Sequence, residues 1–153
     1  VDVFRLVEEV KTMLSTLIGE MNLKVTTDIG RGTILTADRR AVKQMLINLL
    51  SNAIKFSHKF GSIHIAAKTD KDGMLVLSVS DTGIGIAPER LSTIAEPFIS
   101  SNVYAKEKGG AGIGLSITKR LINLHDGDLE VQSEPGIGST FSLVFPTAQR
   151  SAA

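Results

Sequence analysis

One predicted helix in this sequence carries a polar stripe that needs a partner. Residues 39–57 follow Asp38, a suitable N-cap, and apolar side chains recur there at helical spacing. Beside the apolar face, four polar side chains spaced four, four and three residues apart lie one above another: Gln44, Asn48, Asn52 and Lys55. Carboxamides and an ammonium group are costly to bury unpaired. The stripe therefore predicts that the fold or a ligand brings polar groups to this helix.

Composition narrows the classes of function. A formal net charge of +1 and no strongly basic run argue against nucleic-acid binding, which uses clustered basic residues. The lack of cysteine excludes disulfides, iron–sulfur clusters and thiolate zinc sites, and it fits a reducing, cytoplasmic compartment. No apolar run reaches the ~20 residues that span a bilayer. We expect no direct membrane contact by this segment, and a longer parent protein could still be membrane-anchored.

The remaining pattern predicts one α+β domain over residues 1–147 and a disordered tail over 148–153. Main helices are expected at 3–18, 39–57 and 113–124, a short helix at 88–94, and strands at 23–29, 33–36, 62–69, 74–80, 128–133 and 139–145. Asp72-Gly73 is a strong hairpin signal. This pattern favours a two-layer sandwich, in which three helices cover one face of a mostly antiparallel sheet of about five strands.

A glycine-rich run, residues 109–114, precedes the last helix. Glycines let a backbone approach a ligand closely, and a helix N-terminus offers free N–H groups, so the run has the features of a phosphate cradle. It is not a P-loop, because Leu115-Ser116 follows Gly114 where Lys-Ser/Thr is needed. It is not a Rossmann fingerprint, because no strand directly precedes the glycines. Alone, it fits a phosphate site and a flexible lid without a ligand equally well.

A second glycine-bearing turn, residues 81–86, follows a buried strand. Asp81 can accept a hydrogen bond from an amino group in a pocket, and the glycines leave room for a flat ligand. Alone, the turn is better explained as an ordinary strand end that Asp81 caps. In the polar stripe, carboxamide oxygens suit Mg²⁺ and Lys55 suits phosphate, although a solvated helix edge explains the stripe as well.

Taken together and in this order, the motifs resemble the ATP-binding catalytic domain of sensor histidine kinases. These belong to the GHKL superfamily, which has the Bergerat fold. Asn48–Phe56 is similar to the N box, Asp81–Gly85 to the G1 box, Glu96-Pro97-Phe98 to the F box and Gly110–Leu115 to the G2 box. The resemblance extends to Phe145. It implies a mixed sheet and an ATP lid.

The resemblance also implies a role for each motif residue, with ATP and Mg²⁺ as the cofactors. It places Asn52 on the metal and the phosphates with Asn48 nearby, Lys55 on phosphate, and Asp81 on the adenine amino group. Asn48, Asn52 and Lys55 form the implied catalytic set. The rest of the implied nucleotide site consists of Phe56, Gly83, Gly85, Ile86, Lys108, Gly110, Gly112, Ile113, Gly114, Leu115 and Thr140. Phe98 either anchors the lid or belongs to the core, and Lys106 and Lys108 either reach phosphate or stay solvated.

The implied reaction transfers the γ-phosphate to a histidine on a separate helical dimerisation and phosphoacceptor domain outside this chain, and a response regulator is the further partner. ATPases of the superfamily carry a glutamate where this chain has Asn48, a side chain that cannot act as a base. Vigorous hydrolysis is therefore not expected. None of the three histidines has the setting of a phosphoacceptor.

Two alternatives remain open at this point. Ala111 stands where many family members have threonine or serine, which leaves room for a pseudokinase or regulatory module of the same fold. A serine-directed anti-sigma kinase or an ATPase of the superfamily is the other alternative. We expect this chain alone to be monomeric and its parent to be a homodimer.

Overall fold

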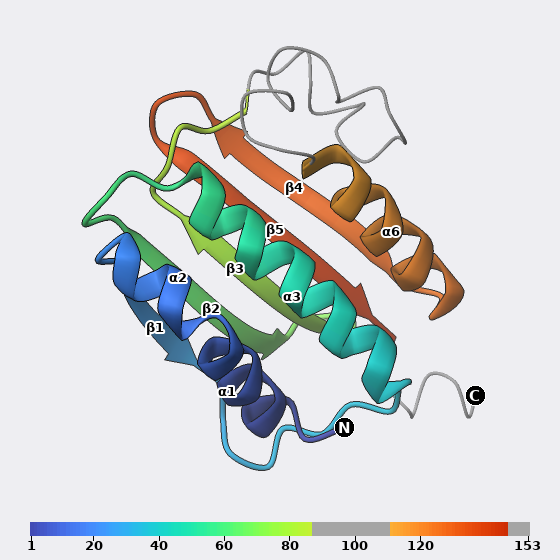
Figure 1. Cartoon of the computed structure of the whole chain (residues 1–153). Coiled ribbons are helices and arrows are strands. Elements are labelled where there is room, and N and C mark those ends of the chain that lie inside the picture. The colour runs from blue at the N-terminus through green and yellow to red at the C-terminus, as the bar shows by residue number, and fades with distance from the viewer. Residues whose placement is uncertain (87–110, 147–153) are drawn as a thin grey trace.

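The computed structural model describes residues 1–86 and 111–146 of the chain. Five strands form one sheet in the order β1-β2-β3-β5-β4 (Figure 1). Their bounds are β1 Lys24–Asp28, β2 Ser62–Thr69, β3 Leu75–Asp81, β4 Asp128–Glu134 and β5 Gly138–Phe145. β1 and β2 run parallel, and the other neighbouring pairs are antiparallel. The mixed, mostly antiparallel sheet is confirmed.

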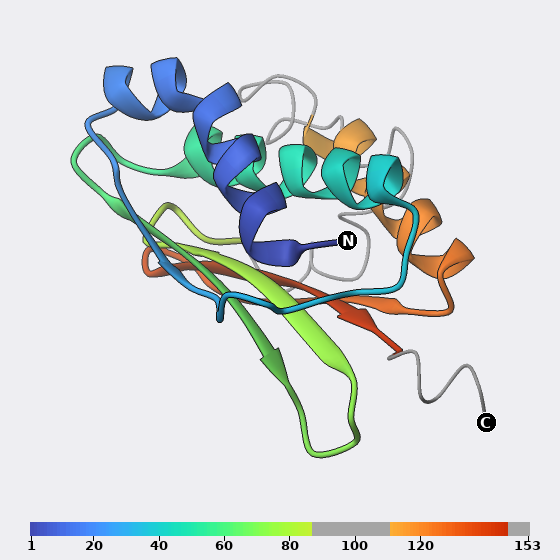
Figure 2. The ribbon, with the colours of Figure 1, turned by 90° about the horizontal axis from the view of Figure 1, so that it is seen from below.

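The described helices cover one face of this sheet, and Figure 2 shows them together on that side. They are α1 Val3–Met13, α2 Ser15–Glu20, α3 Arg39–Phe56 and α6 Ala111–Leu124. The two-layer sandwich is therefore confirmed. Within residues 1–86 and 111–146, no helix combines the length and the apolar character needed to cross a membrane.

α3 forms where the local signals predict it. The Asp38 side chain accepts a hydrogen bond from the Arg40 N–H at 3.0 Å and so caps the first turn. At the other end, the Ser57 hydroxyl donates to the Ala53 carbonyl at 2.6 Å. Both ends of the helix thus have side-chain partners for backbone groups that lack one within the helix.

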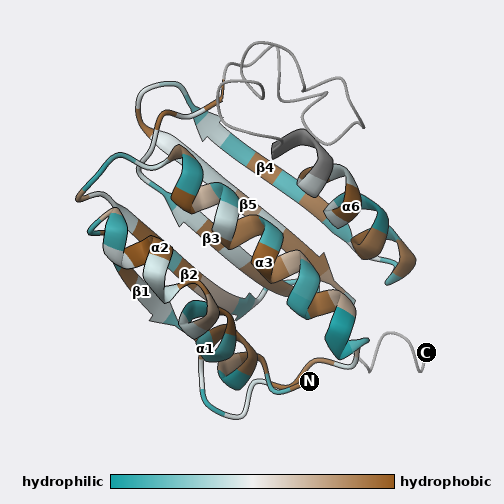
Figure 3. Ribbon diagram, viewed as in Figure 1, coloured by the Kyte–Doolittle hydropathy of each residue, from teal (hydrophilic) through white to brown (hydrophobic). Residues whose placement is uncertain are grey.

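The core lies between the helices and the sheet. Its members on α3 and β3 include Val42, Met45, Leu46, Leu49, Leu75, Leu77 and Val79, all almost fully buried. Each helix carries hydrophilic and hydrophobic residues around its circumference (Figure 3), as expected for helices that pack one face on a sheet. Because burial of each large apolar side chain contributes ~1.5–3 kcal/mol, this apolar face positions α3.

Two expectations about the N-terminal region are wrong. The helix predicted over 3–18 is two helices, which meet at Leu14. α1 buries four apolar side chains, whereas α2 buries none fully and packs against the core through the partly buried Ile18. The strand predicted over 33–36 is reduced to an isolated bridge between Asp2 and Ile34. This pairing cannot lengthen, because the chain turns into α1 at Val3.

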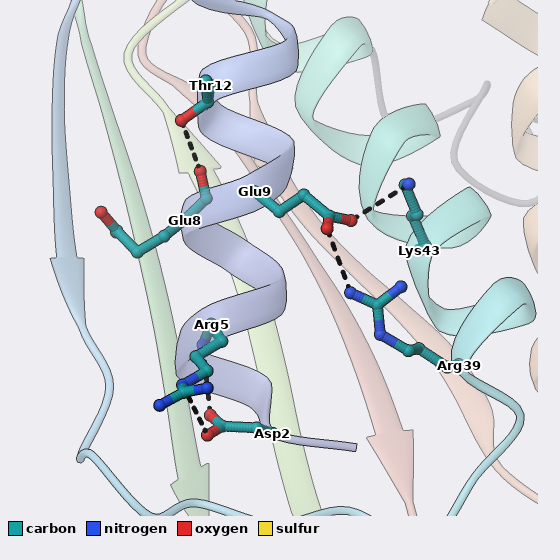
Figure 4. Close-up of polar contacts among 7 residues, drawn as sticks. All are labelled: Asp2, Arg5, Glu8, Glu9, Thr12, Arg39 and Lys43. Carbon is teal, nitrogen blue, oxygen red and sulfur yellow. Dashed lines mark hydrogen bonds and ion pairs between the residues drawn. The ribbon is translucent and has the colours of Figure 1, made fainter.

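An ion-pair cluster joins α1 to α3 (Figure 4). Glu9 of α1 lies 3.0 Å from the Lys43 ammonium and 3.1 Å from the Arg39 guanidinium. Lys43 and Arg39 hold the pKa of the Glu9 carboxyl below its usual range. Because these side chains are partly exposed, the cluster adds little to stability.

α6 is tied to α3 at its C-terminal end by His125. The Nδ1 of His125 lies 2.9 Å from the Leu121 carbonyl oxygen, and its Nε2 accepts a hydrogen bond from the Asp38 N–H at 3.2 Å. These contacts require the neutral ring with its proton on Nδ1, because a carbonyl only accepts and a backbone N–H only donates. One imidazole thus links the end of α6 to the start of α3.

Candidate functional site

Asp81 ends β3 near the centre of the sheet, between Ile63 of β2 and Ser139 of β5. Its side chain is 8% exposed and accepts a hydrogen bond from the Gly83 N–H at 2.9 Å. Burial raises the pKa of this carboxyl, and hydrogen bonds from the backbone of Gly83 and Ser139 act in the opposite direction. The site thus contains a buried carboxyl held by backbone donors.

The turn after Asp81 packs closely against the backbone at the end of α3 and against the backbone at the end of β4. A Cβ added at Gly83 would lie 2.0 Å from the Phe56 carbonyl oxygen, which accepts from the Ile84 N–H at 3.1 Å. Gly85 has a φ of +74°, and a Cβ there would lie 2.2 Å from the Glu134 carbonyl oxygen. Both positions therefore need glycine, because the protein backbone fills the space that a side chain would take.

The end of this turn is held by the β4–β5 hairpin. Ile86 is 4% exposed, and its N–H donates to the Ser133 hydroxyl at 2.7 Å. The Ser133 and Ser139 hydroxyl oxygens lie 2.8 Å apart. A chain of serines thus connects the turn to the strand beside Asp81, and the sequence patterns considered above did not point to Ser133.

The C-terminal half of the polar stripe lies at the end of α3, whose last residue, Phe56, contacts this turn through its backbone. Asn52 is 6% exposed, and within the described ranges its carboxamide makes no hydrogen bond. Phe56 is buried at the end of α3, and Lys55 is exposed beside it. The Asn52 carboxamide therefore keeps hydrogen-bonding capacity for a ligand.

The N-terminal half of the stripe meets α6. The Asn48 Nδ2 donates to the Gly114 carbonyl at 3.1 Å and to the Thr118 hydroxyl at 3.2 Å. The Asn48 Oδ1 accepts from the Gln44 Nε2 at 3.0 Å. The fold itself therefore supplies partners for Gln44 and Asn48. Gly112, Ile113 and Gly114 belong to the first turns of α6, and Leu115 is buried.

Ser139, and not Thr140, shares a face of the sheet with Asp81. Ser139 pairs with Asp81 across the strands, whereas Thr140 pairs with Ser80 and lies 2.9 Å from its hydroxyl. Since side chains alternate along a strand, the Thr140 side chain lies on the opposite face. The same alternation, counted back from the buried Phe141, could have identified Ser139 from the sequence.

Several predicted elements lie outside the described residues. These are the short helix at 88–94, the F box with Phe98, Lys106, Lys108, Gly110, and the tail at 148–153. The predicted roles of Asn48, Asn52, Lys55 and Asp81 as ligands of nucleotide or metal remain predictions, and the structure places these four residues on α3 and at the end of β3.

A family model described as "Histidine kinase-, DNA gyrase B-, and HSP90-like ATPase" matches residues 37–149. The chain belongs to this family. This histidine kinase-like domain is 46% identical over 128 residues to the "Non-motile and phage-resistance protein" of Caulobacter vibrioides, covering 81% of the domain and 15% of that protein. It is 39% identical over 110 residues to "Histidine protein kinase DivJ" of the same species, covering 72% and 18%.

Solved structures share the fold. The catalytic domain of histidine kinase ThkA superposes with a TM-score of 0.83 at 28% identity, covering 95% of each chain. Full-length ShkA in complex with AMPPNP superposes on the histidine kinase-like domain with a TM-score of 0.84 at 30% identity, covering 97% of the domain and 30% of ShkA. The domain spans 15% to 29% of the length of the first curated relatives it matches.

Proposed function

We propose that this chain is the ATP-binding catalytic domain of a two-component sensor histidine kinase. In this function it binds Mg-ATP and transfers the γ-phosphate to a histidine on a separate helical dimerisation domain. The observation that carries the proposal is the buried pairing of Asp81 with Ser139, followed by a glycine turn that contacts the end of α3, in a chain of this family.

The adenine end of the site is assigned to Asp81. The exocyclic amino group of adenine is a donor, and a buried carboxyl that already holds backbone donors is a matching acceptor. Ser139 lies on the same face and is the hydroxyl best placed to assist. Gly83 and Gly85 keep the turn close to α3 and β4 and so shape this end of the pocket.

The phosphate end is assigned to Asn52, Lys55 and the start of α6. A carboxamide oxygen is a suitable ligand for Mg²⁺, which takes few protein ligands. Across residues 1–86 and 111–146 no three acidic or imidazole side chains converge on a possible metal site, so the remaining ligands would come from phosphate and water. The metal, when bound, neutralises charge on the phosphates.

Asn48 is the reason why we expect the γ-phosphate to be transferred to a nucleophile other than water. A carboxamide cannot take a proton from water, and both ends of this one are engaged by Gln44 and α6. The residues of this chain therefore hold and orient the nucleotide, and the attacking imidazole comes from the helical domain. The response regulator is the proposed recipient of the phosphoryl group, and the cytoplasm is the proposed location.

The test combines binding and transfer. Calorimetry of this chain with ATP, with and without Mg²⁺, measures nucleotide binding. Incubation with radiolabelled ATP and a purified helical domain carrying its histidine measures transfer, and the same helical domain with histidine replaced by glutamine is the control. Label on the helical domain that carries the histidine, with none on the glutamine control, supports the proposal. Binding without any transfer would instead favour a regulatory module, and no binding would overturn both.

A further inference from the structure

We propose that Thr118 is a positioning residue, which together with Asn48 fixes the first turns of α6 against α3 in the geometry that the triphosphate needs. This inference rests on the proposed function. Thr118 is fully buried, and its hydroxyl donates to the Gly114 carbonyl at 3.0 Å while accepting from the Asn48 Nδ2 at 3.2 Å. We name Asn48, Gly114 and Thr118 the α3–α6 clasp.

The hydrogens of the clasp have one consistent assignment. The Gly114 carbonyl can only accept, so the Asn48 atom 3.1 Å away must be the amide nitrogen. The two amide hydrogens then serve Gly114 and Thr118. The single hydroxyl hydrogen of Thr118 also points to Gly114. Gln44 donates to the remaining Asn48 oxygen, which fixes the orientation of the carboxamide.

The clasp lies close to the residues assigned to phosphate. Asn48 and Asn52 are four residues apart on α3 and so share one face of the helix. Gly114 is in the first turns of α6, whose free N–H groups are the proposed phosphate donors. The clasp therefore sets the spacing between the proposed metal ligand and these donors. The hydrogen bonds of Asp81 come from Gly83 and Ser139 and not from the clasp, so we expect the adenine end not to depend on the clasp.

Thr118→Val tests this role because it keeps the shape of the side chain and removes the hydroxyl. We expect affinity for Mg-ATP to fall about tenfold, the order of one net hydrogen bond, and affinity for ADP to change less than about threefold. Thr118→Ser keeps the hydroxyl and should restore the wild-type ratio of the two affinities. Thr26→Val is the control at an exposed site: it removes the hydroxyl of Thr26 on β1, which is hydrogen-bonded to His64 on β2, and it should leave the ratio unchanged.

Asn48→Asp separates the clasp from a direct metal role. An aspartate keeps an oxygen for Mg²⁺ but cannot donate to the Gly114 carbonyl. Without nucleotide or metal, amide exchange at residues 114–118 should be faster in this variant than in the wild type, because the carboxylate repels the Gly114 carbonyl oxygen. Wild-type exchange there would overturn the clasp.

Amide hydrogen exchange without nucleotide provides a readout that is independent of the proposed function. Exchange at residues 114–118 should be faster in Thr118→Val than in the wild type or in Thr118→Ser. If Thr118→Val does not fold by circular dichroism, Thr118→Ala, which adds no steric strain, takes its place. Wild-type exchange rates together with a wild-type ATP-to-ADP ratio in the valine or alanine variant would refute the inference. Failure of the wild-type chain to bind Mg-ATP would refute only the proposed function.

Discussion

Replacing Asp81 with asparagine keeps the size of the side chain and removes its charge. The new carboxamide oxygen can still accept the Gly83 N–H, but the amide nitrogen cannot accept from Ser139 or from an adenine amino group. A hydrogen bond to a charged acceptor contributes ~1.5–3 kcal/mol. We therefore expect adenine nucleotides to bind about 10- to 150-fold more weakly.

The stability of the Asp81→Asn variant should change little at neutral pH. Removing a carboxyl whose pKa is raised by burial favours the folded state, and losing one backbone donor disfavours it. The two effects oppose each other, so we expect the free energy of unfolding at pH 7 to change by less than ~1 kcal/mol. Weak binding would then not be explained by unfolding.

The pH dependence carries a definite sign. Because the folded pKa of Asp81 lies above its unfolded value, the folded wild type takes up a proton first as pH falls. The stability linked to this proton is fully present below the unfolded pKa and is lost as pH rises through the folded pKa. Relative to Asp81→Asn, the wild type should therefore gain stability between pH 7 and pH 4.

Two measurements check these expectations. Calorimetry with Mg-ATP gives the affinities, and urea unfolding of both proteins at pH 7, 5 and 4 gives the difference in unfolding free energy. If the variant bound Mg-ATP with wild-type affinity, the assignment of Asp81 to the adenine site would be wrong. A wild type that loses stability relative to the variant on acidification would contradict the assigned effect of burial.

Three further predictions follow from the contacts described above. Gly83→Ala should lower the free energy of unfolding in urea by ~1–3 kcal/mol, because its Cβ would meet the backbone at the end of α3. Gly19→Ala is the control: nothing lies within 4 Å of the added Cβ, so this variant should be neutral or slightly stabilised. Asn52→Asp should weaken Mg-ATP binding in calorimetry by at least about tenfold, because a buried carboxylate repels phosphate. Unchanged affinity would show that Asn52 does not lie at the metal and phosphate site. His125→Leu should lower the unfolding free energy by ~0.5–1.5 kcal/mol, since it removes the acceptor of the exposed Asp38 N–H at the start of α3. The folded variant should keep wild-type nucleotide affinity.

Elements with strong local signals could be predicted well from the sequence. α3 begins directly after Asp38 and ends at Phe56, one residue from the expected position, because capping and apolar period agree there. The hairpin around Asp72-Gly73 connects β2 and β3 as expected. These signals depend on neighbours in the sequence and need no knowledge of tertiary contacts.

Features that depend on distant contacts were harder to predict. The break at Leu14 could not be seen in the sequence, because the helical periodicity of apolar residues continues past it. The partners of Asn48 come from α6, 66 and 70 residues away, so the sequence reveals its polarity but not what it meets. Which of Ser139 and Thr140 lies on the same face as Asp81 depends on strand register, and a shift of one residue would exchange the two.

In the sheet order, the two described segments of the chain form two separate groups of neighbouring strands, which contact each other along one interface. β1, β2 and β3 pair among themselves within residues 1–86, β4 and β5 pair within 111–146, and the β3–β5 ladder with the α3–α6 contact unites the two pieces. The proposed nucleotide site draws Asp81 and Asn52 from the first piece and the start of α6 from the second. A ligand at 100 times its Kd would add ~2.7 kcal/mol to stability, and here that energy would oppose separation of the pieces. Nucleotide should therefore promote assembly of two separately produced fragments cut between Ile86 and Ala111.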